Sequence, residues 1–297
     1  MKLAIRDDDL NFFFNPEEIE NNYKDIWDIC PISMSVIPFI KGNWPQYVKD
    51  AKEKGPGNLS QKDIIKILAD NCVYPIGDNI ELVDFIRKKI QENKVYLTFH
   101  AIHHRNEDNI IPHFSNNFGI GAEFYTSRDL TKPLSSAIKY IEKTFNQPIK
   151  VFTPPQNLLN SNGIKAIMNN HLAICCDFPR IKDISTLKLF GLTNYLKYAF
   201  FKIKHNFISY PFVISNNSYK IIGHHRLQPG SNIEELYSAF KNNYNQNGLF
   251  VVSTHSNGFN YKMENYDKTM GDTLKEFIFH TTKYPNIQFV TLNQIFK

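Results

Sequence analysis

Residues 1–10 of the chain, MKLAIRDDDL, place three consecutive aspartates directly after a short apolar segment. We predict a strand over residues 2–6, followed at once by Asp7, Asp8 and Asp9. A helix start comes next, because Asn15 is a favoured N-cap residue and Pro16 is pre-organised for the first helical position. A strand, an acidic run and a helix in this order indicate the first unit of an α/β fold.

The alternation of strands and helices continues through most of the chain. Such alternation favours a parallel sheet over a sandwich, and about seven strands favour a closed or nearly closed (β/α) barrel. The 297 residues then form one domain, since α/β barrels commonly occupy this length. The further strands are predicted at residues 33–39, 95–99, 149–153, 249–253 and 287–292, and the helices after the first at residues 61–71, 80–93, 134–145, 163–169 and 274–283.

The composition excludes several classes of protein. Hydrophobic residues make up 42% of the chain and charged residues 21%, which is globular. Lys and Arg number 34 against 29 Asp and Glu, a dilute excess without a cluster, so we expect no nucleic-acid partner. We find no signal-peptide pattern and no apolar run of the roughly 18–20 residues that span a bilayer, and therefore expect a cytoplasmic protein without a transmembrane segment. The four cysteines include no CxxC pair and are expected to be free thiols.

One segment, approximately residues 177–226, interrupts the alternation with a high density of aromatic side chains, and we expect an insertion there. Two interpretations stay open. The segment lines a glycan groove or makes peripheral contact with a membrane surface, or it is an ordinary core helix and hairpin with solvated lysines. Its aromatic residues are Tyr195, Tyr198, Phe200, Phe201, Phe207, Tyr210 and Phe212, and its interleaved cations are Lys197, Lys202, Lys204 and His205.

Unusual polar residues follow several of the predicted strands at the point where each strand ends. The loops after parallel strands of an α/β barrel open on one face, so these side chains are expected to meet there. His100 and His104 also have the i, i+4 spacing that is known from metal-binding helices. The residues concerned are Asp7, Asp8 and Asp9 after the first strand, His100, His103 and His104 after residues 95–99, Asn157 after residues 149–153, and His255 after residues 249–253.

A cluster of aspartates at one strand end costs free energy unless a positive charge lies beside it. One Asp with two neutral His is a typical open metal site, which leaves a position for water. A second aspartate can accept a proton from that water, and a histidine across the cleft can donate one to a departing amine. The residue types therefore predict metal-assisted hydrolysis of an amide.

Four motifs carry these residues: Arg6-Asp7-Asp8-Asp9-Leu10, His100-Ala101-Ile102-His103-His104, Phe152-Thr153-Pro154-Pro155-Gln156-Asn157 and Ser253-Thr254-His255. In kind and order they resemble the motifs of polysaccharide deacetylases (the NodB-homology domain, carbohydrate esterase family 4), in the divergent branch that opens with Arg-x-Asp-Asp and an apolar residue. The resemblance covers residues 3 to about 295. It implies a NodB-like distorted barrel, one divalent metal ion with zinc as the first candidate, and N-deacetylation of an amino sugar or glycan precursor in surface polysaccharide biosynthesis.

Carried over residue by residue, the resemblance implies that Asp8 is the general base and that His255 is the general acid. It implies Asp9, His100 and His104 as metal ligands. If the aspartate pair of the motif corresponds to Asp7 and Asp8, then Asp7 is the base and Asp8 the ligand. The pair of Asp8 and Asp9 is favoured, because Leu10 then stands where the motif has its apolar residue. His103 is the alternative to His104 as a metal ligand. If His104 is the ligand, we expect His103 to lie beside the ligands or to face substrate.

The third motif departs from the family pattern, because Thr153 stands where the family usually has an arginine that orients the catalytic aspartate. Arg6 or another cation supplies that charge, or the base is tuned differently, or activity is lost. Asn157 is expected to bind substrate or to cap a helix. Glu123, in a Glu-Phe pair similar to one in the divergent branch, is expected to bind substrate or to hold a ligand histidine. We expect a structural role for His224 and His225.

The expected substrate is a nucleotide-linked or lipid-linked amino sugar, which follows from the expected location alone. Two rivals remain. One is another metal amidohydrolase acting on a small amide, and the other is a catalytically silent glycan-binding module, which Thr153 favours.

Overall fold

The computed structural model describes residues 1–54, 60–108, 121–177, 186–205, 210–216 and 219–297. In this part of the chain ten strands form one sheet, in the order β10-β11-β1-β2-β5-β6-β7-β9-β8, with β14 paired to β1. The strands are β1 (Lys2–Leu10), β2 (Ile32–Val36), β5 (Val95–Phe99), β6 (Val151–Phe152), β7 (Ala173–Cys175), β8 (Ile214–Asn216), β9 (Tyr219–Ile222), β10 (His225–Arg226), β11 (Leu249–Thr254) and β14 (Gln288–Phe289).

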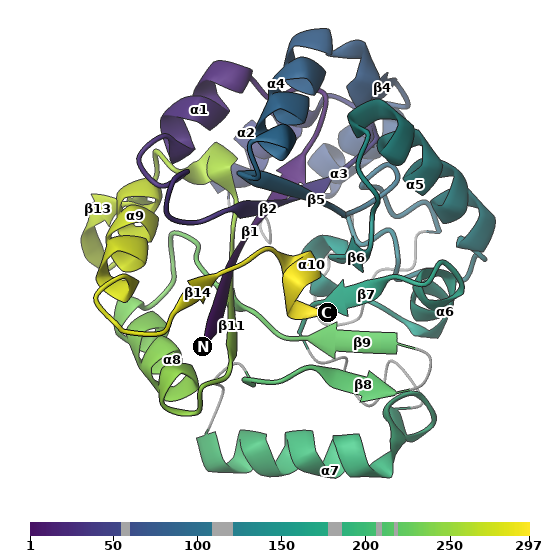
Figure 1. Ribbon diagram of the computed structural model, residues 1–297. Helices are drawn as coiled ribbons and strands as arrows, with labels where there is room; N and C mark the ends of the chain where they lie inside the picture. The colour runs from purple at the N-terminus through teal and green to yellow at the C-terminus, as the bar shows by residue number, and fades with distance from the viewer. Residues whose placement is uncertain (55–59, 109–120, 178–185, 206–209, 217–218) are drawn as a thin grey trace.

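Each pair of neighbouring strands in this sheet is parallel except β8 and β9, which run antiparallel. The sheet curves around a common centre (Figure 1), but in the described residues no hydrogen bonds join β10 to β8. The predicted distorted (β/α) barrel is therefore confirmed, as a barrel that remains open between its edge strands.

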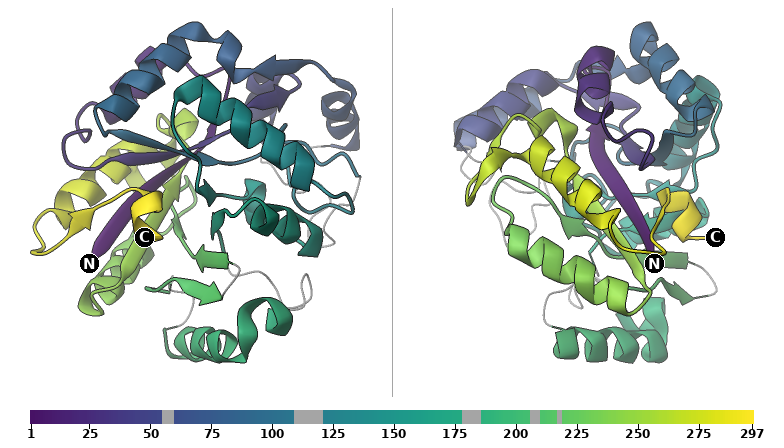
Figure 2. Two further views of the ribbon diagram at one scale, coloured as in Figure 1. Left: turned by 45° about the vertical axis from the view of Figure 1, so that its right-hand side comes forward. Right: turned by 60° about the vertical axis from the view of Figure 1, so that its left-hand side comes forward.

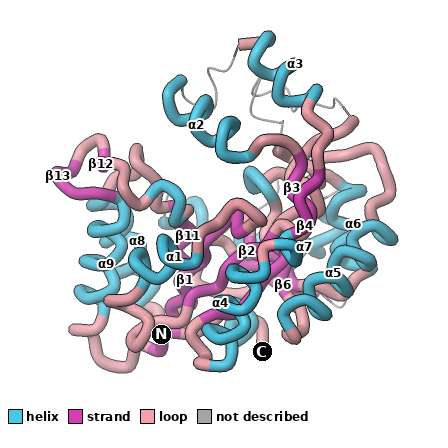
Figure 3. Tube along the Cα trace, turned by 90° about the horizontal axis from the view of Figure 1, so that it is seen from above, coloured by secondary structure: helices cyan, strands magenta, loops and turns pink. Residues whose placement is uncertain are grey.

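The helices surround the sheet, as two further views show (Figure 2). A smaller unit at one end holds two helices and a two-stranded ribbon, and it stands apart from the central strands (Figure 3). The surrounding helices are α1 (Pro16–Tyr23), α4 (Ile80–Gln91), α5 (Thr131–Phe145), α6 (Ser161–Asn169), α7 (Thr186–His205), α8 (Ile233–Asn245) and α9 (Met270–Thr281). The smaller unit comprises β3 (Phe39–Lys41), α2 (Trp44–Lys54), α3 (Gln61–Ala69) and β4 (Val73–Pro75), and the remaining elements are β12 (Lys262–Met263), β13 (Tyr266–Thr269) and α10 (Leu292–Ile295).

Local sequence signals set several of these boundaries. The side chain of Asn15 accepts a hydrogen bond from the backbone N–H of Glu17 at the start of α1. Ser60 and Asp63 form a capping box at the start of α3. β1 is buried along almost its whole length, as expected for a parallel strand covered on both faces.

Several predicted boundaries are wrong. The strand predicted at residues 33–39 ends at Val36, and the helix predicted at residues 274–283 begins at Met270. β1 does not end at Arg6 but continues through the aspartates to Leu10, because pairing with β2 resumes there after a shift in register. The predicted strand over residues 287–292 is shorter, and Leu292 begins α10 after the capping residue Thr291.

The segment from about residue 177 to 226 contributes both to the barrel and to its surface. β9 is a strand of the main sheet, and α7 packs beside β8, with edge-on aromatic contacts to residues just before that strand. The ring centroids of Phe201 and Phe212 are 5.7 Å apart, and those of Tyr198 and Tyr210 are 5.3 Å apart. Phe207 lies outside the described residues. Among the described helices none is long and apolar enough to cross a bilayer.

Candidate metal centre

The backbone at Asp9 breaks the alternation of side chains along β1. In a regular strand Asp7 and Asp9 would share one face and Asp8 would lie on the other. Asp9 instead has a φ of 76°, inside a register shift between Asp7 and Leu10. As a result Asp8 and Asp9 both line one cavity, while Asp7 Oδ1 accepts a hydrogen bond of 2.8 Å from the backbone N–H of Ser256. A left-handed conformation at a non-glycine residue is costly and is typical of functional sites.

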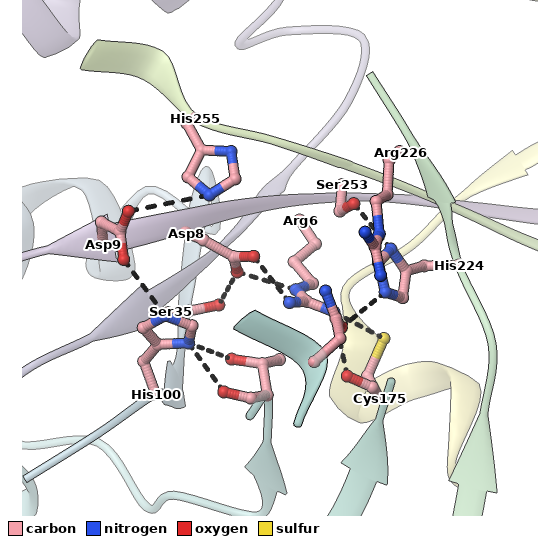
Figure 4. A network of polar contacts seen from close by, with 12 residues as sticks. Arg6, Asp8, Asp9, Ser35, His100, Cys175, His224, Arg226, Ser253 and His255 are labelled. Atoms are coloured by element: carbon pink, nitrogen blue, oxygen red, sulfur yellow. Dashed lines mark hydrogen bonds and ion pairs between the residues drawn. The ribbon is translucent and has the colours of Figure 1, made fainter. Parts of the chain in front are cut away.

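Two imidazoles converge on Asp9. The Nε2 atom of His100 lies 3.1 Å from Asp9 Oδ1 (Figure 4), and the Nε2 atom of His104 lies 3.5 Å from the same oxygen. One ligand atom from each of these three residues lies within 4.8 Å of the others, and all three residues are buried. Asp9 Oδ1 is buried and has no hydrogen-bond partner, although two nitrogens are close to it. The pattern is that of three donor atoms directed at a shared point.

The orientation of His100 is fixed by Thr153. Nδ1 of His100 lies 2.7 Å from the Thr153 carbonyl oxygen, so Nδ1 carries the proton and donates it there. The lone pair of Nε2 then faces Asp9. A ligand histidine whose other nitrogen donates to a carbonyl is a common arrangement in metal sites.

His104 is held in an apolar niche. Its ring packs edge-on against Trp44, with 5.1 Å between the centroids, and its backbone has a left-handed φ of 54°. Residues 100–104 therefore form a loop and not a helix, so the i, i+4 spacing does not work through helix geometry here. Burial, opposed by the Asp9 carboxylate, lowers the pKa of His104 to about 4. The imidazole is therefore neutral at pH 7, as a metal ligand must be.

Glu123 supports the histidine loop from behind. Its carboxylate accepts hydrogen bonds from the backbone N–H groups of Ile102 (2.7 Å) and His103 (3.2 Å). The side chain of His103 turns away as well, with Nδ1 2.8 Å from the Phe39 carbonyl oxygen. Neither Glu123 nor His103 is among the described residues that line the cavity at Asp9, and a contact of either with substrate stays a prediction. The alternative role for Glu123, holding the loop of the ligand histidines, agrees with these contacts.

Arg6 provides the cation beside Asp8 that Thr153 does not provide. Its Nε and Nη2 donate to the two Asp8 carboxylate oxygens at 2.7 and 2.6 Å. Ser35 adds a 2.7 Å hydrogen bond to Oδ1 of Asp8. Burial alone would raise the pKa of Asp8, but Arg6 outweighs burial and holds that pKa well below its usual range.

The other two carboxyls of the run have different environments. Burial raises the pKa of Asp7 to about 7. Burial opposes ionisation of Asp9 too, but the neighbouring imidazoles outweigh burial and lower the pKa of Asp9 to about 2. Asp8 and Asp9 are thus ionised at neutral pH, whereas Asp7 is near its midpoint.

A cavity of about 340 Å³ opens at the carboxyl ends of the strands, over Asp8 and Asp9. His255 stands at its rim with 45% of the side chain exposed, and its Nε2 lies 3.6 Å from Asp9 Oδ2. Asn157 lines the cavity and accepts a 2.7 Å hydrogen bond from buried His224, whose other nitrogen contacts Ser253 Oγ. The sequence did not single out Trp44, Tyr47 and Tyr261, which give the cavity an aromatic wall.

The donor set of Asp9, His100 and His104 fits a divalent cation. The buried, unpartnered Oδ1 and the neutral imidazole of His104 both favour one, and a carboxylate with two imidazoles suits zinc-type ions. Two further ionisable side chains, Asp8 and His255, face the same cavity. The arrangement can therefore polarise a carbonyl and move protons on both sides of it.

No protein-family model and no curated protein sequence matches this chain. The fold, however, is similar to solved structures. A "putative polysaccharide deacetylase" from Mycobacterium smegmatis has a TM-score of 0.52 and 10% identity, over 99% of this chain and 88% of that one. A family 4 acetyl xylan esterase from Clostridium thermocellum, in complex with a cobalt ion, has a TM-score of 0.44 and 12% identity, over 100% and 90%. The Mycobacterium smegmatis structure shows that the chain has the polysaccharide-deacetylase fold that its motifs predict.

Proposed function

We propose that this chain, which has the polysaccharide-deacetylase fold, is a metal-dependent hydrolase that removes the N-acetyl group of an amino sugar. The observation that carries the proposal is the convergence of Asp9, His100 and His104 in a cavity that also receives Asp8 and His255. A solvated acidic turn would not require two buried imidazoles around one carboxylate oxygen. Zinc is the proposed ion because it favours this donor set.

A divalent cation in this position supplies Lewis-acid polarisation of the amide carbonyl and favours ionisation of water at neutral pH. Asp8 is the proposed general base. Arg6 and Ser35 fix its carboxylate in one orientation and keep it ionised, so that it can accept a proton from the attacking water. The pairing lowers the basicity of Asp8, but it holds the carboxylate in a fixed position next to the site of attack.

His255 is the proposed general acid. It is half-exposed at the rim, so its Nε2 can reach both solvent protons and a departing amine on the side of Asp9 away from the histidine loop. Asn157 is the proposed substrate contact. Because its side-chain oxygen accepts from His224, its amide nitrogen remains to donate to a carbonyl or hydroxyl group of the sugar.

The cavity supports a carbohydrate substrate through its size and lining. About 340 Å³ lies at the lower end of small-molecule sites, and aromatic faces stack on sugar rings. A second cavity of about 400 Å³ shares Trp44, Tyr47 and His104 with the first, and Lys41, Lys66 and Arg105 line it together with Asp50 and Asp70. Its cations support a nucleotide-linked or lipid-linked amino sugar, in which a phosphate lies next to the sugar.

The alternative function, a catalytically silent glycan-binding module, was favoured because position 153 holds a threonine and not the arginine of the family. The ion pair of Arg6 with Asp8 removes that reason, since the catalytic aspartate has a buried guanidinium beside it. The small-amide enzyme differs from the proposal only in substrate and is an outcome of the test.

The test has two parts. Metal analysis of purified protein is expected to give about one divalent ion per chain, and Asp9→Asn is expected to lose it. Acetate release is then measured over a panel of N-acetylated nucleotide sugars, with Asp8→Asn as the inactive variant. Asp267→Asn, which changes a fully exposed carboxylate, is the matched control. Metal binding without acetate release from any sugar contradicts the proposal in favour of a binding module or a small-amide enzyme.

A further inference from the structure

Helix α7 presents an apolar stripe to solvent. Leu192, Leu196, Phe200 and Ile203 are 61, 57, 70 and 83% exposed, which makes them four of the most exposed large apolar side chains in the described residues. Their spacing places them within about 80° of arc at 3.6 residues per turn. Singly exposed apolar residues are ordinary, but a continuous stripe along one helix indicates an interaction surface.

The stripe is not the packing face of the helix. The opposite face packs on the barrel, where Tyr198 and Phe201 pack edge-on against the aromatic rings of Tyr210 and Phe212. On the same face, Asn194 donates a 2.6 Å hydrogen bond to the Ser215 carbonyl. These contacts fix the rotation of the helix about its axis. The helix lies along the outer edge of the molecule beyond β8, and none of the described helices and strands covers it in the three ribbon views (Figures 1 and 2).

Positive charge flanks the stripe. Lys197, Lys202 and Lys204 are exposed, with Lys197 and Lys204 on one side of the stripe and Lys202 on the other by helical geometry. Lys197 also lies over the Phe212 ring at 4.1 Å, which keeps its stem along the helix surface. The 20-residue sequence of α7 contains no Asp or Glu.

We propose that α7 docks on an anionic lipid surface, with the stripe of Leu192, Leu196, Phe200 and Ile203 inserted at the boundary of headgroups and acyl chains. A helix that lies in the interface buries a narrow apolar face and sets lysines against anionic headgroups, and α7 has both features. The proposal is independent of the metal centre and of the substrate.

A second copy of this chain is the less favoured occupant. Pairing of two α7 helices through the stripe would bring two sets of flanking lysines together without an acidic residue from either helix, and such like-charge contacts oppose association. An anionic membrane instead offers charge that complements the lysines. The charge pattern therefore selects a lipid surface over self-association.

The test uses the full chain and vesicles of phosphatidylcholine with or without phosphatidylglycerol, in co-sedimentation at low and high salt. We expect binding only where phosphatidylglycerol is present, and weaker binding at high salt. The double variant Phe200→Ser with Ile203→Ser is expected to reduce the partition coefficient at least about tenfold, and Lys204→Gln about fivefold. The matched control, Phe279→Ser with Ile65→Ser, removes the same side chains from exposed positions on α9 and α3 and is expected to bind like the unaltered chain.

Since all four substituted side chains are exposed, melting temperatures of the variants should stay close to that of the unaltered chain, and this measurement confirms that they fold. Three results would overturn the proposal. They are no binding to either vesicle, an equal loss of binding in the control variant, or a concentration-dependent dimer in sedimentation velocity that the Phe200→Ser with Ile203→Ser variant dissolves.

Discussion

Arg6 and Asp8, two residues apart on β1, form a bidentate ion pair inside the barrel, with donor–acceptor distances of 2.7 and 2.6 Å. Residues i and i+2 of a strand share a face, so the pair forms within one strand. Arg6 is completely buried, and its remaining nitrogen, Nη1, donates to the Cys175 carbonyl at 2.9 Å, which ties β1 to β7 across the barrel. The pair thus joins the catalytic candidate Asp8 to the framework of the fold.

Removing Arg6 alone should leave a buried carboxylate without a partner. We expect Arg6→Gln to lower the free energy of unfolding by about 3–5 kcal/mol, and the double variant with Asp8→Asn to recover much of this loss. Urea unfolding of both single variants and the double variant measures the coupling. Arg87→Gln, in an exposed pair with Asp84, serves as control and should cost less than about 1 kcal/mol. Additive losses in the cycle would show that the two side chains do not depend on each other.

Glu123 should influence metal binding without touching the metal. Glu123→Gln retains one carbonyl oxygen for the backbone N–H groups of Ile102 and His103, where the carboxylate offers two. We expect the affinity for zinc, measured by calorimetry, to fall by about 10–100-fold as the histidine loop loosens. Glu81→Gln, at an exposed position of α4, should leave the affinity unchanged. An unchanged affinity in Glu123→Gln would mean that the loop holds its shape without this carboxylate.

Gly121 has no side chain, and the ring of His104 occupies the space where a side chain at this position would begin. A Cβ at this position would lie 2.5 Å from Cε1 of His104, which is too close, so the ring must move in Gly121→Ala. We expect the zinc affinity to fall by about tenfold or more. Gly230→Ala is the matched control, since a Cβ there meets its nearest atom, on Glu264, at an ordinary 3.4 Å. Equal zinc affinities of the two variants would contradict the assignment of His104 as a ligand.

His255 should matter for the reaction more than for metal binding. His255→Gln is expected to keep the bound ion and to lower kcat for acetate release by about 10²–10⁴-fold, the range for loss of a proton donor. Exposed His171→Gln is the control for both measurements. A parallel loss of metal and activity would instead assign His255 to the metal ligands. The distance of 3.6 Å between its Nε2 and Asp9 Oδ2 is short enough for that role.

Buried His224 should make the protein sensitive to acid. Burial lowers its pKa to about 3, against about 6.5 in the unfolded chain, so the unfolded state binds more protons below pH 6.5. The contribution of His224 to the free energy of unfolding is therefore complete above pH 6.5. It falls as the pH drops toward 3, by at most about 1.4 kcal/mol per pH unit. Burial lowers the pKa of His225 to about 4, which acts in the same direction. Urea unfolding of metal-free protein from pH 7 to pH 4 measures the slope, which should be shallower in His224→Gln and unchanged in His171→Gln.

The strand and helix order was predictable because its signals are local. Val95–Phe99 consists of β-branched and aromatic residues together with a leucine, and it is the strand β5 at those bounds. The capping box of Ser60 and Asp63 begins α3 at the first residue of the helix predicted over residues 61–71. The boundaries that failed include those at Arg6 and Leu292. These two depend on pairing with a neighbouring strand and on the start of a terminal helix, which a local pattern does not contain.

The sequence by itself determined the α/β class, the positions where polar side chains follow strands, and the residue types that suit a metal-assisted hydrolase. The register within the three aspartates stayed open, because the aspartate pair of the motif can correspond to Asp7 and Asp8 or to Asp8 and Asp9. Only the tertiary structure turned Asp9 toward the imidazoles, through a left-handed backbone that the neighbouring strands hold in place. It also turned Glu123 beneath the histidine loop, a contact between residues distant in the sequence that no local period contains.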